Sequence, residues 1–258
     1  MKKILVFLFL FIAHNLFAQE IFTYGDFSYT INENNEITIT SYRGSLSSLD
    51  IPSVIDGKTV TTIGERAFYD CESLTSITIP NSVKTIGDYA FYYCDSLTSI
   101  IIPNSVTTIG DGAFSYCESL TSITIPNSVT TIGDNAFTNC YSLTSIIIPD
   151  SVTTIGNDAF SGCDSLTSIT IPNSVTTIGD GAFDDCYSLI NIKISENNKT
   201  FAVIDNILYD KKEKMLHTCF SKKTNVVIPN GILKINNIAF SECKSLTSIT
   251  KPDSVTTI

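Results

Sequence analysis

Cysteines are the side chains whose number and spacing first suggest chemistry. The chain of 258 residues holds eight of them, an even count that could form a disulfide framework. Seven share one position of a repeated segment, and Cys219 alone lies off that register. Equivalent positions on neighbouring coils have parallel Cβ vectors, which are unfavourable for bridging, so the sequence predicts buried free thiols. The seven in register are Cys71, Cys94, Cys117, Cys140, Cys163, Cys186 and Cys243.

Catalysis by these thiols would need a base, and histidine is scarce. The chain has two histidines, His14 and His217, and we expect His14 to be removed with an N-terminal leader. A nucleophilic cysteine needs such a base, and a zinc site needs clustered cysteine pairs that the sequence lacks. The sequence therefore predicts a protein that is not an enzyme, with no catalytic residue, no metal site and no cofactor.

Acidic residues form two stripes with the same period. Four aspartates follow a glycine, with Asn157 and Asp158 in the fifth copy, and a second stripe follows the cysteine. A calcium ladder or a carboxylate pair is the functional interpretation, but regular recurrence argues against one catalytic pair. Capping of short helices and solubility are the simpler interpretation. The stripes are Asp88, Asp111, Asp134 and Asp180, and Glu72, Asp95, Glu118 and Asp164.

Composition and the first residues restrict where the protein acts. Its formal net charge of -10 makes nucleic acid and anionic lipid surfaces poor partners. A basic start, an apolar run over residues 4–12 and Leu16-Phe17-Ala18 have the layout of a signal peptide over residues 1–18. The alternative, a membrane anchor, would need a longer apolar run. We therefore expect export, with the protein secreted or at the cell surface and no transmembrane segment in the mature chain.

The elements that must position these residues repeat every 23 residues. The segment Leu74–Pro80 returns from Leu97, Leu120, Leu143 and Leu166. Alternation of isoleucine with Ser and Thr predicts a short half-buried strand ended by proline. A second apolar pair then follows, as a strand or as extended chain, and the spacing of Ala, Phe and Cys predicts one or two helical turns capped by Asp88. Stacked units would bury these positions as continuous ladders.

The ends of the repeat carry their own signals. Residues 19–45 predict a β-hairpin that caps the solenoid, and the repeats extend over residues 46–258. Residues 195–222 interrupt the period with a second hairpin, expected to project or lie on one flank; it is a tolerated insertion or a ligand contact. The sequence stops at Ile258 before the next Ala-Phe block, which suggests an incomplete unit or an edge covered by a partner.

The string L-x-x-I-x-I-P-x-S-V-x-x-I-G-x-x-A-F-x-x-C resembles the BspA-type leucine-rich repeat, also known as the Treponema pallidum type. The resemblance covers Leu46 to Ile258. It implies a right-handed leucine-rich-repeat coil with a parallel β-sheet on one face and short helical turns on the other. It also implies an exported or cell-surface protein that binds a host matrix or cell-surface protein.

One surface of the predicted sheet is the candidate binding face. Its outward residues are Ser and Thr with isoleucine in alternate coils, and tyrosines after the phenylalanine, such as Tyr92 and Tyr116, form a competing flank. The function we expect is a non-catalytic protein-binding or adhesion module. The alternative is a structural spacer, or the N-terminal part of a larger surface protein whose active module lies beyond the C-terminus. The candidate face comprises Ser76, Thr78, Ser99, Ile101, Ser122, Thr124, Ser145, Ile147, Ser168 and Thr170.

Overall fold

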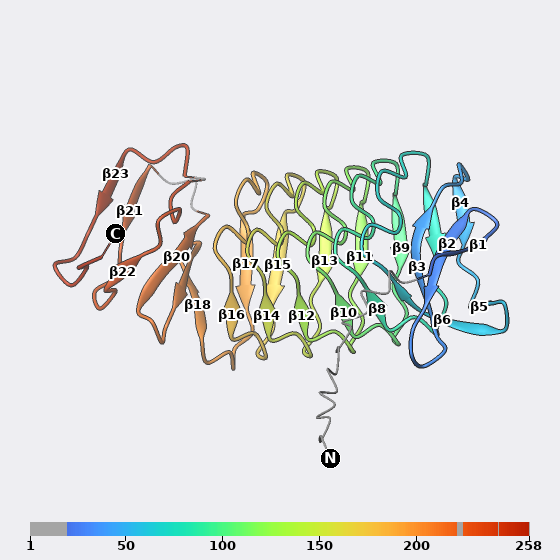
Figure 1. The fold of residues 1–258 in the computed structure, drawn as a ribbon. Coiled ribbons are helices and arrows are strands. Elements are labelled where there is room, and N and C mark those ends of the chain that lie inside the picture. The colour runs from blue at the N-terminus through green and yellow to red at the C-terminus, as the bar shows by residue number, and fades with distance from the viewer. Residues whose placement is uncertain (1–19, 221–223, 242, 258) are drawn as a thin grey trace, which may run out of the picture.

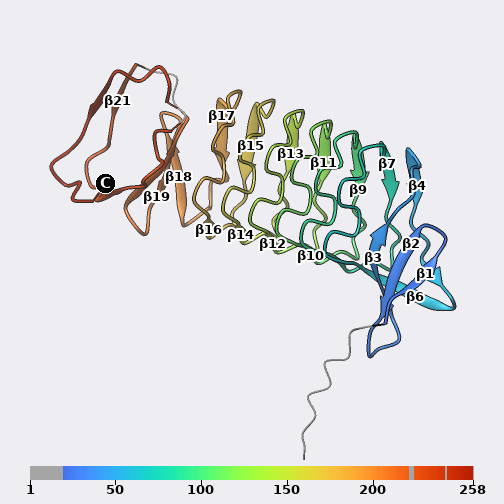
Figure 2. The same ribbon diagram turned by 45° about the horizontal axis from the view of Figure 1, so that its top comes forward.

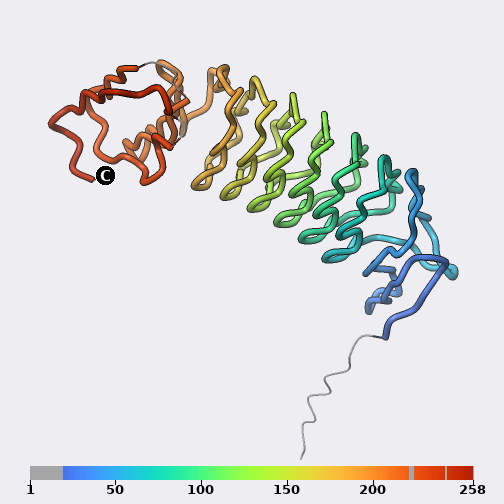
Figure 3. Tube along the Cα trace, turned by 90° about the horizontal axis from the view of Figure 1, so that it is seen from above, coloured from blue at the N-terminus to red at the C-terminus, as the bar shows by residue number. Residues whose placement is uncertain are grey.

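The structure is a computed structural model that describes residues 20–220, 224–241 and 243–257. The predicted signal peptide lies outside these residues. The chain winds into coils that stack along a gently curved axis, with the N-terminal strands at one end and residues 201–257 at the other (Figures 1 and 3). This arrangement confirms the predicted solenoid.

Two rows of strands run along the solenoid on different sides of each coil (Figure 2). The first row is a sheet of ten strands, in which β5 pairs with β6 beside the main path. Its members are β1 (Phe22–Tyr24), β2 (Phe27–Ile31), β3 (Ile37–Tyr42), β5 (Val54–Ile55), β6 (Lys58–Ile63), β8 (Thr85–Ile86), β10 (Thr108–Ile109), β12 (Thr131–Ile132), β14 (Thr154–Ile155) and β16 (Thr177–Ile178). The second apolar pair of each repeat is therefore a strand of two residues.

The second row contains the predicted Leu-x-x-Ile-x-Ile strands. It is divided into a parallel sheet of five strands and a parallel pair, and in both every residue faces its equivalent in the next coil, as Ser99 faces Ser122. Because the register is in phase, each isoleucine of one coil covers the isoleucine of the next. The strands are β4 (Ser48–Asp50), β7 (Ser76–Thr78), β9 (Ser99–Ile101), β11 (Ser122–Thr124) and β13 (Ser145–Ile147), followed by β15 (Ser168–Ile171) and β17 (Asn191–Ile194).

The third side of each coil is a chain of turns, and no helix occurs among the described residues. The prediction of helical turns was therefore wrong. Tyr89 and Tyr93 have φ of 55° and 60°, which ends any helical run, and the amide of Phe91 donates to Ala113 O of the next coil at 2.8 Å. The physical reason is space: phenylalanine rings of neighbouring coils lie 5.3 Å apart, whereas an α-helix is about 10 Å wide.

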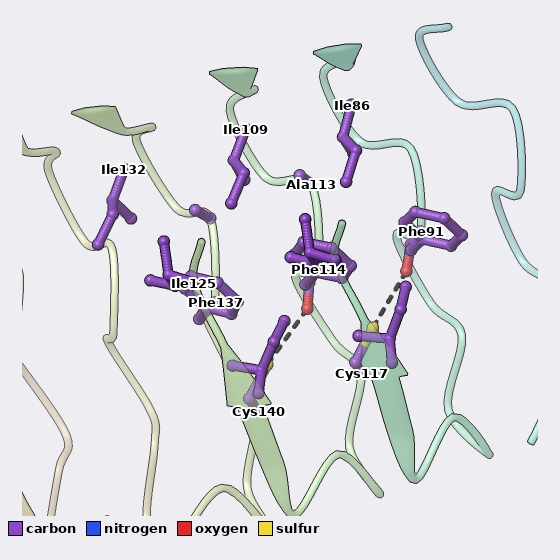
Figure 4. Close-up of a cluster of buried hydrophobic side chains, with 14 of the residues drawn as sticks. Ile86, Phe91, Ile109, Ala113, Phe114, Cys117, Ile125, Ile132, Phe137 and Cys140 are labelled. Carbon is purple, nitrogen blue, oxygen red and sulfur yellow. Dashed lines mark hydrogen bonds between the residues drawn. The ribbon is translucent and has the colours of Figure 1, made fainter. Parts of the chain in front are cut away.

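The core is a set of ladders inside the coils. Phenylalanines of successive turn blocks stack with centroids 5.1–5.7 Å apart and nearly parallel planes, from Phe68 to Phe183. Ladder cysteines lie beside them, and Cys117 Sγ donates to Phe91 O at 3.2 Å (Figure 4). Phe114 and Cys140 are fully buried. Each coil thus buries its apolar side only against its neighbours, as stacked repeats must.

Both ends of this stack are covered by antiparallel strands. At the N-terminus β1, β2 and β3 are antiparallel, and β3 then pairs in parallel with β6. After β17 comes an antiparallel sheet of three strands, β18 (Phe201–Ile204), β19 (Ile207–Asp210) and β20 (Met215–Cys219). It is followed by the parallel partner of β20, β22 (Lys234–Ile235), and by the pair β21 (Asn225–Val227) and β23 (Ser248–Thr250).

The second hairpin does not project, and it does not lie on a flank. Phe201 and Leu208 pack into the main core, while Ile207 and Leu216 pack into a second core with residues of the last coils. The sheet β18–β20 is thus a partition with an apolar cluster on each side. Because apolar residues point to both of its faces, an exposed position would leave one face in water.

Candidate binding surfaces

All ten predicted binding residues lie on the outer side of five strands of the second row, and we call this surface the strand face. The strands are β7, β9, β11, β13 and β15. Nine of them are exposed and Ser76 is half-buried. Ser and Thr hydroxyls at its edge bond the coil before, as Thr98 Oγ1 donates to Thr75 O at 3.2 Å. The sheet divides between β13 and β15, so Ser168 and Thr170 lie on a separate strand pair. The strand face carries no charged side chain.

Two large apolar side chains stand on the strand face. Ile101 and Ile147 are 80% and 68% exposed, and both lie beside Thr124 in the sheet register. Threonine occupies the same position in β7, β11 and β15, so the fold does not require isoleucine there. The residue pair is therefore an apolar feature that folding does not explain.

A hollow of about 600 Å³ lies at the C-terminal end of the strand face. Its lining includes Thr170 of the strand face, Lys193 of β17 and Ala202 of β18, with Lys211 from the turn after β19. The strand face therefore ends against the partition in a hollow that carries charges of both signs, from Lys193, Lys211 and Glu196. Residues of the insertion thus line this hollow together with the last strands of the second row.

Five tyrosines of three successive coils form a second surface, which we call the tyrosine flank: Tyr69, Tyr89, Tyr92, Tyr93 and Tyr116. Tyr69 stacks on Tyr92 at 5.4 Å, and Tyr93 lies 4.6 Å from Tyr116. Burial and the neighbouring phenols raise the pKa of Tyr92 to about 12. Sequence reasoning missed Tyr69 and Tyr89; the 23-residue spacing from Tyr69 to Tyr92 was the available signal.

Acidic groups surround the tyrosine flank. Asp95 Oδ1 is buried without a hydrogen-bond partner, and burial together with the carboxylates of Glu118, Glu72 and Asp70 raises the pKa of Asp95. The guanidinium of Arg66 lies 5.4 Å from the centre of the Tyr89 ring. The flank thus combines aromatic faces with negative charge, a combination that attracts cations.

The other acidic stripe bonds to the backbone of the next coil. Asp88 Oδ1 accepts from the amide of Asp111 at 2.9 Å, Asp111 from Asp134 at 2.8 Å, and Asp134 from Asn157 at 2.7 Å. Asp88 was predicted to cap a helix within its own coil, and that prediction was wrong because the acceptor serves the neighbouring coil. No group of three or more metal-ligating side chains occurs within the described ranges.

His217 and seven of the eight cysteines are buried, and Cys71 is half-buried. His217 Nε2 lies 3.0 Å from Ile178 O and its Nδ1 lies 2.9 Å from Thr218 Oγ1, so both ring nitrogens already have partners. Burial lowers the pKa of His217 and raises the pKa of Cys117 and Cys163 well above the ordinary thiol range. These thiols are held in the protonated, unreactive form.

No helix in the described part of the chain is long and apolar enough to cross a membrane. The sequence profile described as the BspA type leucine rich repeat region matches the chain in six copies, over residues 35–163, 130–215 and 212–258. Among the curated proteins compared, none matches this chain.

Several solved structures resemble the fold. A leucine rich cell surface protein of Faecalibacterium prausnitzii is 36% identical with a TM-score of 0.77, over 93% of this chain and 72% of that one. The pneumococcal vaccine antigen PcpA is 25% identical with a TM-score of 0.76, over 92% and 71%. A leucine-rich repeat protein of Bacteroides ovatus is 28% identical with a TM-score of 0.60, over 92% and 78%.

Proposed function

Because this chain belongs to the BspA type leucine rich repeat family, we propose that it is an exported, non-catalytic module that binds a protein partner at or near the cell surface. Two solved relatives are named a cell surface protein and a vaccine antigen, which supports that location. The partner class is a matrix or surface protein of a host, and the binding serves adhesion.

The observation that carries this proposal is the exposure of Ile101 and Ile147 on the strand face. Large isoleucines in water weaken solubility and contribute nothing to the buried ladders. Burying both against a partner would contribute about 3 kcal/mol or more, at roughly 25 cal/mol per Å². The neighbouring serines and threonines supply hydrogen-bonding groups around this apolar centre, which is the usual layout of a protein interface.

The tyrosine flank is the second candidate surface. Tyrosine is enriched in the binding hot spots of interfaces, and Tyr69 is 44% exposed. However, Tyr92, Tyr93 and Tyr116 are half-buried against one another. Their contacts run across coils and stabilise the stack, so the flank has a structural role that the strand-face isoleucines lack.

A binding measurement with paired variants tests both surfaces. The mature chain would be passed over immobilised matrix proteins and intact host cells, and saturable binding measured by surface plasmon resonance and flow cytometry. We expect Ile101→Thr with Ile147→Thr to weaken binding at least tenfold, because it restores the threonine of the other coils and leaves the core intact. The matched flank variant, Tyr69→Ser, should change affinity less than threefold.

The outcomes separate the alternatives. A loss confined to the tyrosine variant would move the site to the flank. Absence of saturable binding by a correctly folded wild-type chain would contradict the proposed function and favour the structural-spacer interpretation. Circular dichroism and the unfolding midpoint of each variant control for folding.

A further inference from the structure

Cys219, the cysteine outside the ladder, ends β20 and meets Cys243, the last ladder cysteine. Their Sγ atoms lie 2.6 Å apart, and both residues are buried. Unbonded heavy atoms ordinarily pack at about 3.5–4.0 Å, whereas a disulfide bond is about 2.05 Å long. The two sulfurs are therefore much closer to bonding distance than to an ordinary contact.

The backbone explains how these two thiols come to face each other. In a regular coil the phenylalanine amide donates to the alanine carbonyl of the next coil, as Phe91 N does to Ala113 O at 2.8 Å. The carbonyl of the same phenylalanine accepts from the cysteine thiol of the next coil, as Phe91 O does from Cys117 Sγ at 3.2 Å. Cys219 makes the same two bonds, with its amide 2.7 Å from Ala239 O and its carbonyl 3.3 Å from Cys243 Sγ. Cys219 thus occupies the structural position of a ladder phenylalanine.

The presence of Cys219 at a phenylalanine position changes the surroundings of the Cys243 thiol. In the regular coils the residue beneath the cysteine directs an aromatic ring into the phenylalanine stack, and the thiol bonds to its carbonyl. At Cys219 the ring is replaced by a second thiol, on a different backbone segment. The two Cβ atoms therefore belong to unlike positions, and the parallel arrangement that disfavours bridges within the ladder does not apply.

We propose that Cys219 and Cys243 are a disulfide site, closed when the protein meets a thiol oxidant. Each thiol gives up one proton, an S–S bond forms between the two Sγ atoms, and the two electrons reduce the disulfide of a thiol oxidant to two thiols. In the cell this step rests on the proposed export, because exported proteins meet oxidising surroundings. The bond would fasten the partition sheet to the last coils.

The direct test counts and maps thiols in the purified full chain. The protein is refolded in a mixture of reduced and oxidised glutathione, denatured in an alkylating reagent and digested for mass spectrometry. The reduced chain has eight thiols. After oxidation we expect an intact mass lower by about 2 Da before alkylation, six alkylated thiols, and one linked peptide pair containing residues 219 and 243. Cys219→Ser should lack that pair, and the ladder variant Cys163→Ser should keep it.

Two further readouts make the proposal falsifiable. Eight alkylated thiols after oxidation, or a bond that joins other cysteines and leaves Cys219 and Cys243 unbridged, would overturn the proposal. Cys71 is the most accessible competing thiol, because it is half-buried while the other seven are buried. If the bond forms, cleavage within residues 224–257 by a protease should slow at least tenfold, reversed by a reductant. Protein recovered from cells tests export separately, since the glutathione experiment does not depend on it.

Discussion

The regular coils from β7 to β16 and the last coils from β20 to β23 use the same motif with different results. In the regular coils Phe114 is fully buried, and Ile100 and Ile123 are about 5% exposed. In the last coils Phe240 is only half-buried and Ile249 is 43% exposed. A hollow of about 430 Å³ lined by Ile235, Phe240 and Ile249 lies beside the second core.

The two regions also differ at the glycine position of the motif. Each regular coil has a glycine where the chain passes close to the coil beneath, and a Cβ on Gly110 would lie 2.7 Å from Asp88 N. The last coils have Asn236 there, and its Nδ2 donates to Asp180 Oδ1 at 2.6 Å across the partition. Glycine is needed where the backbone beneath comes this close, and the same holds against the cap strand β3, since a Cβ on Gly64 would lie 2.7 Å from Ile39 O. The motif specifies a coil, and the neighbouring coil specifies how tightly it packs.

The largest expected effect comes from removing one phenylalanine ring from each region. Phe114→Ala should lower the free energy of unfolding by about 3–5 kcal/mol, because it leaves a gap in a continuous stack. Phe240→Ala should cost less than half as much, since Phe240 is half-buried beside a hollow. Urea unfolding followed by circular dichroism gives both values, and equal costs would contradict the difference in packing.

The glycine exchange should give the next largest effect. Gly110→Ala should cost about 1–3 kcal/mol, because the added Cβ forces the coils apart. Asn236→Gly makes the reverse exchange in the last coils and should cost about 1 kcal/mol, for one lost hydrogen bond. The unfolding midpoint of each variant is the measurement. A harmless Gly110→Ala would show that the coils are not held at the close approach described.

His217 of β20 contacts Ile178 of the regular coils through Ile178 O. We expect protonation of His217 in acid to lower the free energy of unfolding. Burial lowers the pKa of His217 in the folded protein, so below the ordinary histidine pKa of about 6.5 the unfolded chain binds the proton more readily. Its stabilising contribution is therefore present above pH 6.5 and is lost below it, by at most about 1.4 kcal/mol per pH unit. His217→Gln should flatten the dependence of the unfolding midpoint on pH between 7.5 and 5.5.

Other groups give the control for that experiment. Burial raises the pKa of Asp158, Asp164 and Asp184, so these carboxyls favour the folded state as the pH falls toward 4. Their effect has the opposite sign and should persist in the histidine variant. If wild type and His217→Gln show the same slope between pH 7.5 and 5.5, His217 is not the titrating group.

The smallest effect should come from the aspartate ladder, which runs only through the regular coils. Asp134→Ala removes the acceptor of the Asn157 amide and side-chain amide and should cost about 1 kcal/mol. Asp134→Asn keeps an acceptor oxygen and should cost less than half of that. Thermal unfolding at low and high salt separates the hydrogen bond from the charge, since only the latter is screened.

The sequence predicted the parts that depend on periodicity. Alternation around Ile77 and Ile100 identified the buried face and the register, because a slip of one residue would expose every isoleucine. The outward placement of Ser99 and Ile101 followed from the same alternation. Thr85 and Ile86 were harder to interpret, because two residues are too few to show a period of two.

The failed predictions came from patterns that two structures share. Apolar residues three and four apart suit a helix and also suit successive turns, and the positive φ of Tyr89 is not readable from a tyrosine. The partition sheet was missed because Leu208 and Ile207 are neighbours that pack into different cores. The partners of Tyr69 and Cys219 belong to other coils, and contacts of that kind appear only once the chain is wound.

The in-phase register has a consequence for how such a gene can change. Because each coil meets its neighbour through equivalent residues 23 positions apart, as Ile100 meets Ile123, a duplication of 23 codons within the regular coils creates no new type of interface. Recombination between repeats can therefore lengthen or shorten the strand face in steps of one coil, while the two antiparallel ends stay unchanged. The length of the strand face can therefore vary between related genes while the packing of the core stays the same.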